Sequence, residues 1–80
     1  MRHTHRFVEE YTGIMAFGLE RKTDEETLIC YLQKFSDDAL MQALVGRLSE
    51  AEMDEILTLI TGLMKKHLSE GEYHKLFLKE

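Results

Sequence analysis

Histidine and glutamate side chains near the amino terminus could bind a metal ion. His5 and Glu9 lie four residues apart, so a helical first turn would bring them to one face. His3 is close enough in sequence to add a third ligand. Imidazole and carboxylate groups suit zinc or iron, but this combination is not a recognised metal motif, and exposed chain ends are commonly disordered. A metal site here is therefore an alternative hypothesis.

A second possible set of metal ligands lies near the carboxyl terminus and consists of His67, Glu70 and His74. Their spacing of three and four residues places them along one helix face only if the helix continues through Ser69. The sequence lacks a Cys-x-x-Cys pair, a His-Glu-x-x-His run and the paired Glu-x-x-His pattern of carboxylate-bridged bundles. We expect His67 to cap a helix end, His74 to be exposed, and no metal or cofactor to be bound.

Cys30 is the one thiol in the sequence, so no intramolecular disulfide can form. Helical spacing places it near Glu26 and Lys34, away from the apolar residues of the same segment. A nucleophilic cysteine needs a histidine or a cation that lowers its pKa, and Lys34 is the local candidate. A thiol-dependent enzyme is therefore a third hypothesis. We expect Cys30 instead to pack as a small apolar residue beneath another helix.

Motifs and charge argue against an enzyme and against nucleic-acid binding. The sequence has no glycine-rich phosphate loop, no Gly-x-Ser-x-Gly turn and no calcium-binding loop. None of the fifteen acidic side chains has the apolar sequence setting that marks an acid/base catalyst. The formal net charge of −5 repels phosphate. We therefore expect neither catalysis nor binding to DNA or RNA.

No export signal and no membrane span are recognisable in the sequence. Glu9 and Glu10 interrupt the apolar stretch that follows Arg2 and Arg6. Nothing approaches the roughly eighteen apolar residues that a bilayer-spanning helix needs. We therefore expect a cytoplasmic protein with no membrane partner, and a free thiol agrees with a reducing compartment.

The spacing of apolar residues is helical along the sequence, and no Pro/Gly/Ser-rich linker divides it. The sequence therefore predicts a single all-α domain over residues 1–80, folded as a compact bundle of four to five short helices. Any disorder is expected at residues 1–4. The predicted helices span about residues 4–20, 24–35, 37–45, 50–67 and 70–79.

Capping signals set the predicted helix boundaries. Thr23–Glu26 and Ser49–Glu52 match the capping-box pattern. A similar Leu-Ser-Glu run at Ser69 predicts the start of a last short helix. The alternative is one long helix that continues through Ser69. Gly46 could end the third helix in the left-handed conformation. Either the first helix ends near Gly18, or Gly18, which lies within the first apolar stripe, lets a neighbouring helix approach closely; we favour the second interpretation.

The strongest periodic segment, at about residues 50–67, is predicted to be a longer central helix. Its apolar stripe is predicted to gather the other helices and consists of Met53, Ile56, Leu57, Ile60, Leu63, Met64 and His67. The inward stripe of the helix over residues 24–35 is predicted to be Leu28, Tyr31, Leu32 and Phe35. That of the last helix is predicted to be Tyr73, Leu76 and Phe77.

Small and apolar residues off these stripes predict a second contact surface. Small residues at helical spacing let two backbones come close, and a chain of this size cannot hide every remaining apolar side chain. The predicted surface consists of Phe17, Cys30, Ala51, Thr58, Leu59, Gly62 and Leu78.

These features favour a small, non-catalytic protein-interaction module, regulatory or adaptor in kind, that acts through helix–helix contacts. A marginal core and the second contact surface favour a homodimer. The acidic surroundings favour a basic surface on any further protein partner. A metal- or small-ligand-binding helical bundle that uses His67, Glu70 and His74, or His3 and His5, is the alternative.

Overall fold

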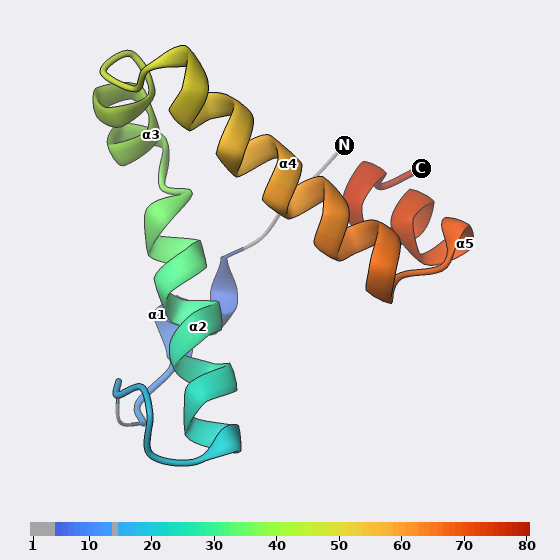
Figure 1. The fold of residues 1–80 in the computed structure, drawn as a ribbon. Coiled ribbons are helices and arrows are strands. Elements are labelled where there is room, and N and C mark those ends of the chain that lie inside the picture. The colour runs from blue at the N-terminus through green and yellow to red at the C-terminus, as the bar shows by residue number, and fades with distance from the viewer. Residues whose placement is uncertain (1–4, 14) are drawn as a thin grey trace. The chain divides into compact units, whose positions relative to one another are not determined.

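The computed structural model describes residues 5–13 and 15–80. All regular structure in this part of the chain is helical and none of it is strand, which confirms the all-α prediction (Figure 1). The expectation of disorder at residues 1–4 and the candidate ligand His3 lie outside the described residues. Contacts divide the chain into two compact units, one spanning Thr4–Leu44 and the other containing Val45–Glu80.

The first unit contains α1 (Arg6–Glu10), α2 (Arg21–Phe35) and most of α3 (Asp38–Val45). The prediction of a helix over residues 4–20 is wrong, because α1 ends at Glu10 and Tyr11 is extended, with φ −74° and ψ 124°. The described residues between α1 and α2 form a loop.

Gly18 turns the chain within this loop. Its φ is 96°, in the left-handed region that favours glycine. Apart from Gly18 itself and its two chain neighbours, no described residue has an atom within 4 Å of the place that a Cβ would take. The expectation that Gly18 admits a neighbouring helix is therefore wrong, and its role is conformational.

The start of α2 is set by contacts with the loop. The helix begins at Arg21, so the predicted capping box at Thr23 is wrong. The Thr23 hydroxyl instead donates to Oε1 of Glu20 at 3.0 Å. The Asp24 carboxylate accepts a hydrogen bond from the Gly18 N–H at 2.7 Å, so Asp24 holds the loop and does not mark the helix start.

Polar side chains of α2 hold α1 and the loop in place. The Thr27 hydroxyl accepts from the N–H of Ala16 at 3.0 Å and donates to its carbonyl oxygen at 2.7 Å. Oε1 of Gln33 accepts from the N–H of Val8 at 2.9 Å. Thr27 and Cys30 are the buried residues of α2, so this side of the helix is the one that packs within the unit.

The predicted inward stripe of α2 is wrong. Its side chains are all exposed, namely Leu28, Tyr31, Leu32 and Phe35. The physical reason is that the hydrogen bonds of Thr27 and Gln33 fix the opposite side of α2 against the loop and α1. Paired polar groups can be buried at little cost, and apolar periodicity does not reveal them.

α3 begins as a capped, acidic first turn. Oδ2 of Asp37 accepts from the N–H groups of Ala39 and Leu40, at 3.0 and 3.3 Å. Gly46 does not have the positive φ expected of it. The chain leaves α3 through a turn in which the Leu48 N–H donates to the Val45 carbonyl at 3.2 Å, and this turn replaces the left-handed stop.

The second unit contains α4 (Glu50–His67), α5 (Glu70–Glu72) and a π-helical turn, η1 (Tyr73–Leu78). The predicted range of the long helix and its capping box are confirmed. The Ser49 N–H donates to Oε1 of Glu52 at 2.8 Å, and the Glu52 N–H donates to the Ser49 hydroxyl at 3.1 Å. Local sequence therefore determines where α4 begins.

The last helical segment is separate from α4. Leu68 is extended, with φ −114° and ψ 143°, and Ser69 forms a second capping box with Glu72. The prediction that Leu76 and Phe77 point inward is wrong, since both are exposed. The π-helical spacing of η1 rotates its side chains away from the positions that a 3.6-residue turn predicts.

Candidate interaction surface

The second unit leaves most of the predicted apolar stripe of α4 exposed, so within this unit the stripe does not gather the last helical segment as predicted. Leu57 is 65% exposed, Leu63 49% and Ile60 43%. Ile56 and Met64 are half-buried. Because the rest of the second unit leaves these side chains open, α4 presents a row of large apolar residues on one side over most of its length.

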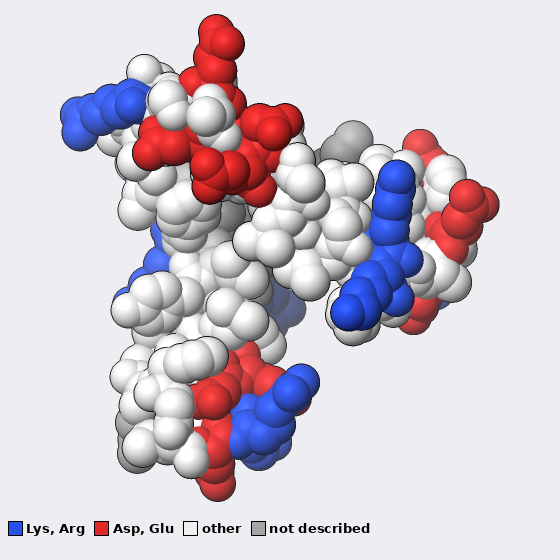
Figure 2. Space-filling model, viewed as in Figure 1, with Lys and Arg blue, Asp and Glu red and all other residues white. Residues whose placement is uncertain are grey.

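Charged residues lie at the two ends of this apolar row. Glu50 and Glu52 occupy the first turn of α4, and Lys65, Lys66 and His67 occupy its last turn. Figure 2 shows acidic side chains around the start of α4, uncharged ones along its middle and basic ones near its end. These signs complement the helix dipole, and they give the two ends of the surface opposite charge.

The opposite flank of α4, predicted as a contact surface, is open as well. Ala51, Thr58 and Gly62 are exposed there, and Leu59 is exposed at the margin between this flank and the apolar row. Outside its own helix backbone and chain neighbours, no atom of the described residues lies within 4 Å of the place that a Cβ on Gly62 would take. Phe17 is also exposed. Leu78 is half-buried, which reduces the apolar area that it could offer to a partner.

Cys30 does not belong to this predicted surface. Its side chain is 1% exposed, because the face of α2 that carries it packs within the first unit. The expectation that Cys30 is a small buried residue is therefore correct, and its assignment to the interaction surface is wrong. A thiol-dependent reaction gains no support from a thiol that substrate cannot reach.

The carboxyl-terminal histidines do not share a helix face. The break at Leu68 separates His67, in the last turn of α4, from Glu70 and His74. Nδ1 of His74 lies 2.7 Å from Oε1 of Glu80. Across residues 5–13 and 15–80, no three His, Cys, Asp or Glu side chains are placed to hold one metal ion. The spacing argument for a metal site at this end therefore fails where the helix breaks.

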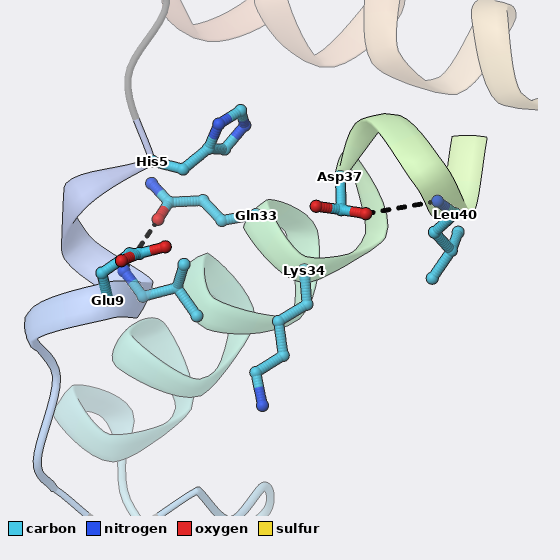
Figure 3. A pocket seen from close by; sticks show the side chains of 7 residues that line it. His5, Glu9, Gln33, Lys34, Asp37 and Leu40 are labelled. Atoms are coloured by element: carbon cyan, nitrogen blue, oxygen red, sulfur yellow. Dashed lines mark hydrogen bonds between the residues drawn. The ribbon is translucent and has the colours of Figure 1, made fainter. Parts of the chain in front are cut away.

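An open depression of about 500 Å³ lies in the first unit at α1, α2 and the start of α3 (Figure 3). Nε2 of His5 lies 2.8 Å from the Ser36 hydroxyl. That hydroxyl donates to the Gln33 carbonyl at 3.1 Å. The Asp37 carboxylate caps α3, and the Lys34 side chain points away from it.

The polar groups of this depression are mostly engaged in holding the fold. Asp37 is committed to the helix cap, and Oε1 of Gln33 to the Val8 N–H. His5 and Glu9, predicted as possible ligands, both line it. Sequence spacing predicted that these two would be neighbours, but Gln33, Lys34 and Asp37 come from elements that local sequence could not place beside them.

Tyr11 connects the loop to α2. Its ring stacks on Phe7, with centroids 5.5 Å apart, and its hydroxyl donates to Oε1 of Glu26 at 3.3 Å. Desolvation, and then the negative charge of Glu26, raise the pKa of Tyr11 above its ordinary value. The phenol therefore stays protonated and acts as a hydrogen-bond donor in the fold.

No helix in the described part of the chain is long and apolar enough to span a membrane. Comparison of the chain with protein-family models, curated proteins and solved structures found no match.

Proposed function

We propose that this protein is a small, non-catalytic interaction module that acts through helix–helix contacts and pairs with a second copy of itself. The observation that supports this proposal is the exposed apolar row on α4, centred on Leu57 and Ile60. A contiguous apolar face of this kind is characteristic of helices that dock on other helices.

The apolar row is a stronger candidate for the contact than the small-residue flank that sequence spacing suggested. Burying a large apolar side chain contributes roughly 1.5–3 kcal/mol, whereas Ala51, Thr58 and Gly62 offer little apolar area to a partner. Acidic side chains near the start of α4 would favour a basic surface on any further protein partner. A cytoplasmic location is part of the proposal and is supported by the free thiol of Cys30.

Sedimentation velocity over micromolar concentrations tests the proposal with two matched variants. Leu57→Asp places a charge in the apolar row, and Thr58→Asp places the same charge on the opposite flank. We expect wild-type protein and Thr58→Asp to pass from monomer to dimer as concentration rises. We expect Leu57→Asp to weaken association at least about tenfold, the effect of losing a central apolar contact.

The same comparison can contradict the proposal. If Thr58→Asp disrupts association and Leu57→Asp does not, the small-residue flank is the contact surface. If the wild-type protein is monomeric throughout and neither variant changes its binding to any protein, it is not an interaction module of this kind. Circular dichroism of both variants controls for loss of helix.

A further inference from the structure

We infer that two copies of this chain pair through α4 in antiparallel orientation, with the acidic start of each helix against the basic end of the other. The inference rests on the proposed function and adds the orientation and register of the contact. Charge complementarity along α4 and the spacing of its apolar residues support it.

The apolar row of α4 has the spacing of a helix–helix seam. Met53, Ile56, Ile60 and Leu63 follow one another at intervals of three and four residues, the pattern that keeps apolar side chains facing a partner helix. One antiparallel register opposes Met53 to the partner's Leu63 and Ile56 to the partner's Ile60. The two-fold axis of the dimer generates each of these contacts twice. Each of these pairs across the seam therefore joins two apolar side chains.

The charges select the antiparallel orientation. Glu52, Leu59 and Lys66 are seven residues apart, so they lie along one flank of the seam. In an antiparallel pair this flank lies against the same flank of the partner helix. Glu52 then lies near the partner's Lys66, and Leu59 lies near the two-fold axis. A parallel pair would bring the acidic first turns together and the basic last turns together, where like charges repel.

The single chain leaves these charges available for such contacts. Glu52 and Lys66 are about 21 Å apart along α4 at 1.5 Å per residue, too far to pair within one helix. Lys65 and Lys66 form no ion pair in the described residues. The Ser49 cap uses Oε1 of Glu52, and Oε2 would accept a hydrogen bond from the partner's Lys66.

Disulfide trapping in the full chain tests the orientation. Met53→Cys and Leu63→Cys are each made in a Cys30→Ala background and oxidised mildly, alone and as an equal mixture. In the inferred register, like positions lie about 15 Å apart along the axis, beyond the reach of a disulfide. We therefore expect little cross-linking of either variant alone and a mixed Met53→Cys/Leu63→Cys dimer, identified by its mass, in the mixture.

A charge reversal provides the second test. Lys66→Glu should weaken dimerisation about fivefold or more, because it puts like charges together at both ends of the seam. Lys65→Glu carries the same change in net charge on the other side of α4, and we expect it to change the association constant less than twofold. Equal effects of the two variants would contradict the Glu52–Lys66 pairing.

The outcomes separate this inference from the proposed function. Ready cross-linking of either cysteine variant alone would show a parallel pair, which overturns the orientation but leaves the interaction module standing. A monomer that binds another protein through Leu57 would overturn this inference and the self-pairing part of the proposed function, and would leave only the helix-docking module standing. A monomer with no Leu57-dependent binding would overturn both.

Discussion

At the scale of single residues, the first unit depends on side chains that local pattern does not identify. Thr27 is 3% exposed, and its hydroxyl satisfies both backbone groups of Ala16. One side chain thereby supplies both a donor and an acceptor to the backbone of Ala16, which lies in a loop. Helical periodicity assigns Thr27 to neither the apolar nor the charged side of α2, so only the structure reveals its role.

Replacement of Thr27 by valine tests this role. Valine keeps nearly the same shape but leaves the N–H and carbonyl of Ala16 without the threonine hydroxyl. We expect the free energy of unfolding to fall by about 1–3 kcal/mol, the usual cost of unsatisfied buried polar groups. Chemical denaturation measures the change. The matched variant Thr23→Val removes only the exposed hydrogen bond to Glu20, and a loss as large as that of Thr27→Val would contradict the account.

Cys30 also shows that the sequence pattern of α2 does not reveal which side of the helix is buried. Its position between Glu26 and Lys34 correctly placed it away from Leu28 and Leu32, but the buried side of α2 proved to be the side of Cys30. Which face of a short amphipathic helix is buried depends on what packs against it. That information lies in the loop and α1, outside the helix itself.

At the scale of elements, boundaries governed by local chemistry were predictable. The hydroxyls of Ser49 and Ser69 each accept a hydrogen bond from the N–H three residues further on. Each serine also donates its own backbone N–H to the carboxylate of the capping-box glutamate. The range of α4 follows from its cap and its periodicity. The length of α1 and the start of α2 were not predictable, because the loop between them is held by Asp24, Thr27 and Gln33 through hydrogen bonds to distant backbone groups.

The cap of α5 predicts a pH dependence confined to that turn. The Ser69 N–H donates to the Glu72 carboxylate at 2.8 Å, and this hydrogen bond lowers the pKa of Glu72 below its ordinary value. The stabilisation is therefore present above the pKa of the unfolded chain. It is lost as the pH falls through the lower pKa of the folded chain.

Nuclear magnetic resonance can follow this loss through the Ser69 amide. We expect its chemical shift to move at a pH below the ordinary glutamate range. Glu72→Gln keeps a neutral acceptor and should abolish the transition. An unchanged transition in Glu72→Gln would assign it to another group and refute the capping explanation.

At the scale of the whole molecule, the fold class and the central helix could be predicted from sequence, whereas the candidate surface was predicted only in part. Periodicity identified the apolar row of α4, but it was interpreted as the core because apolar rows usually are. The flank of Thr58 and Gly62, which spacing predicts as the contact surface, is exposed. Leu57, Ile60 and Leu63 are exposed as well, and our proposal places the contact on them because they offer more apolar area. Periodicity alone cannot distinguish a side chain that packs within its own chain from one that meets a partner.

The apolar row of α4 is the surface that we expect a partner to cover in solution. Hydroxyl-radical footprinting at increasing protein concentration measures this coverage at individual side chains. We predict that Leu57, Ile60 and Leu63 lose reactivity together as the concentration rises through the association range, while exposed Leu28 on α2 keeps its reactivity. Reactivity of the α4 side chains that stays the same at every concentration would contradict the account.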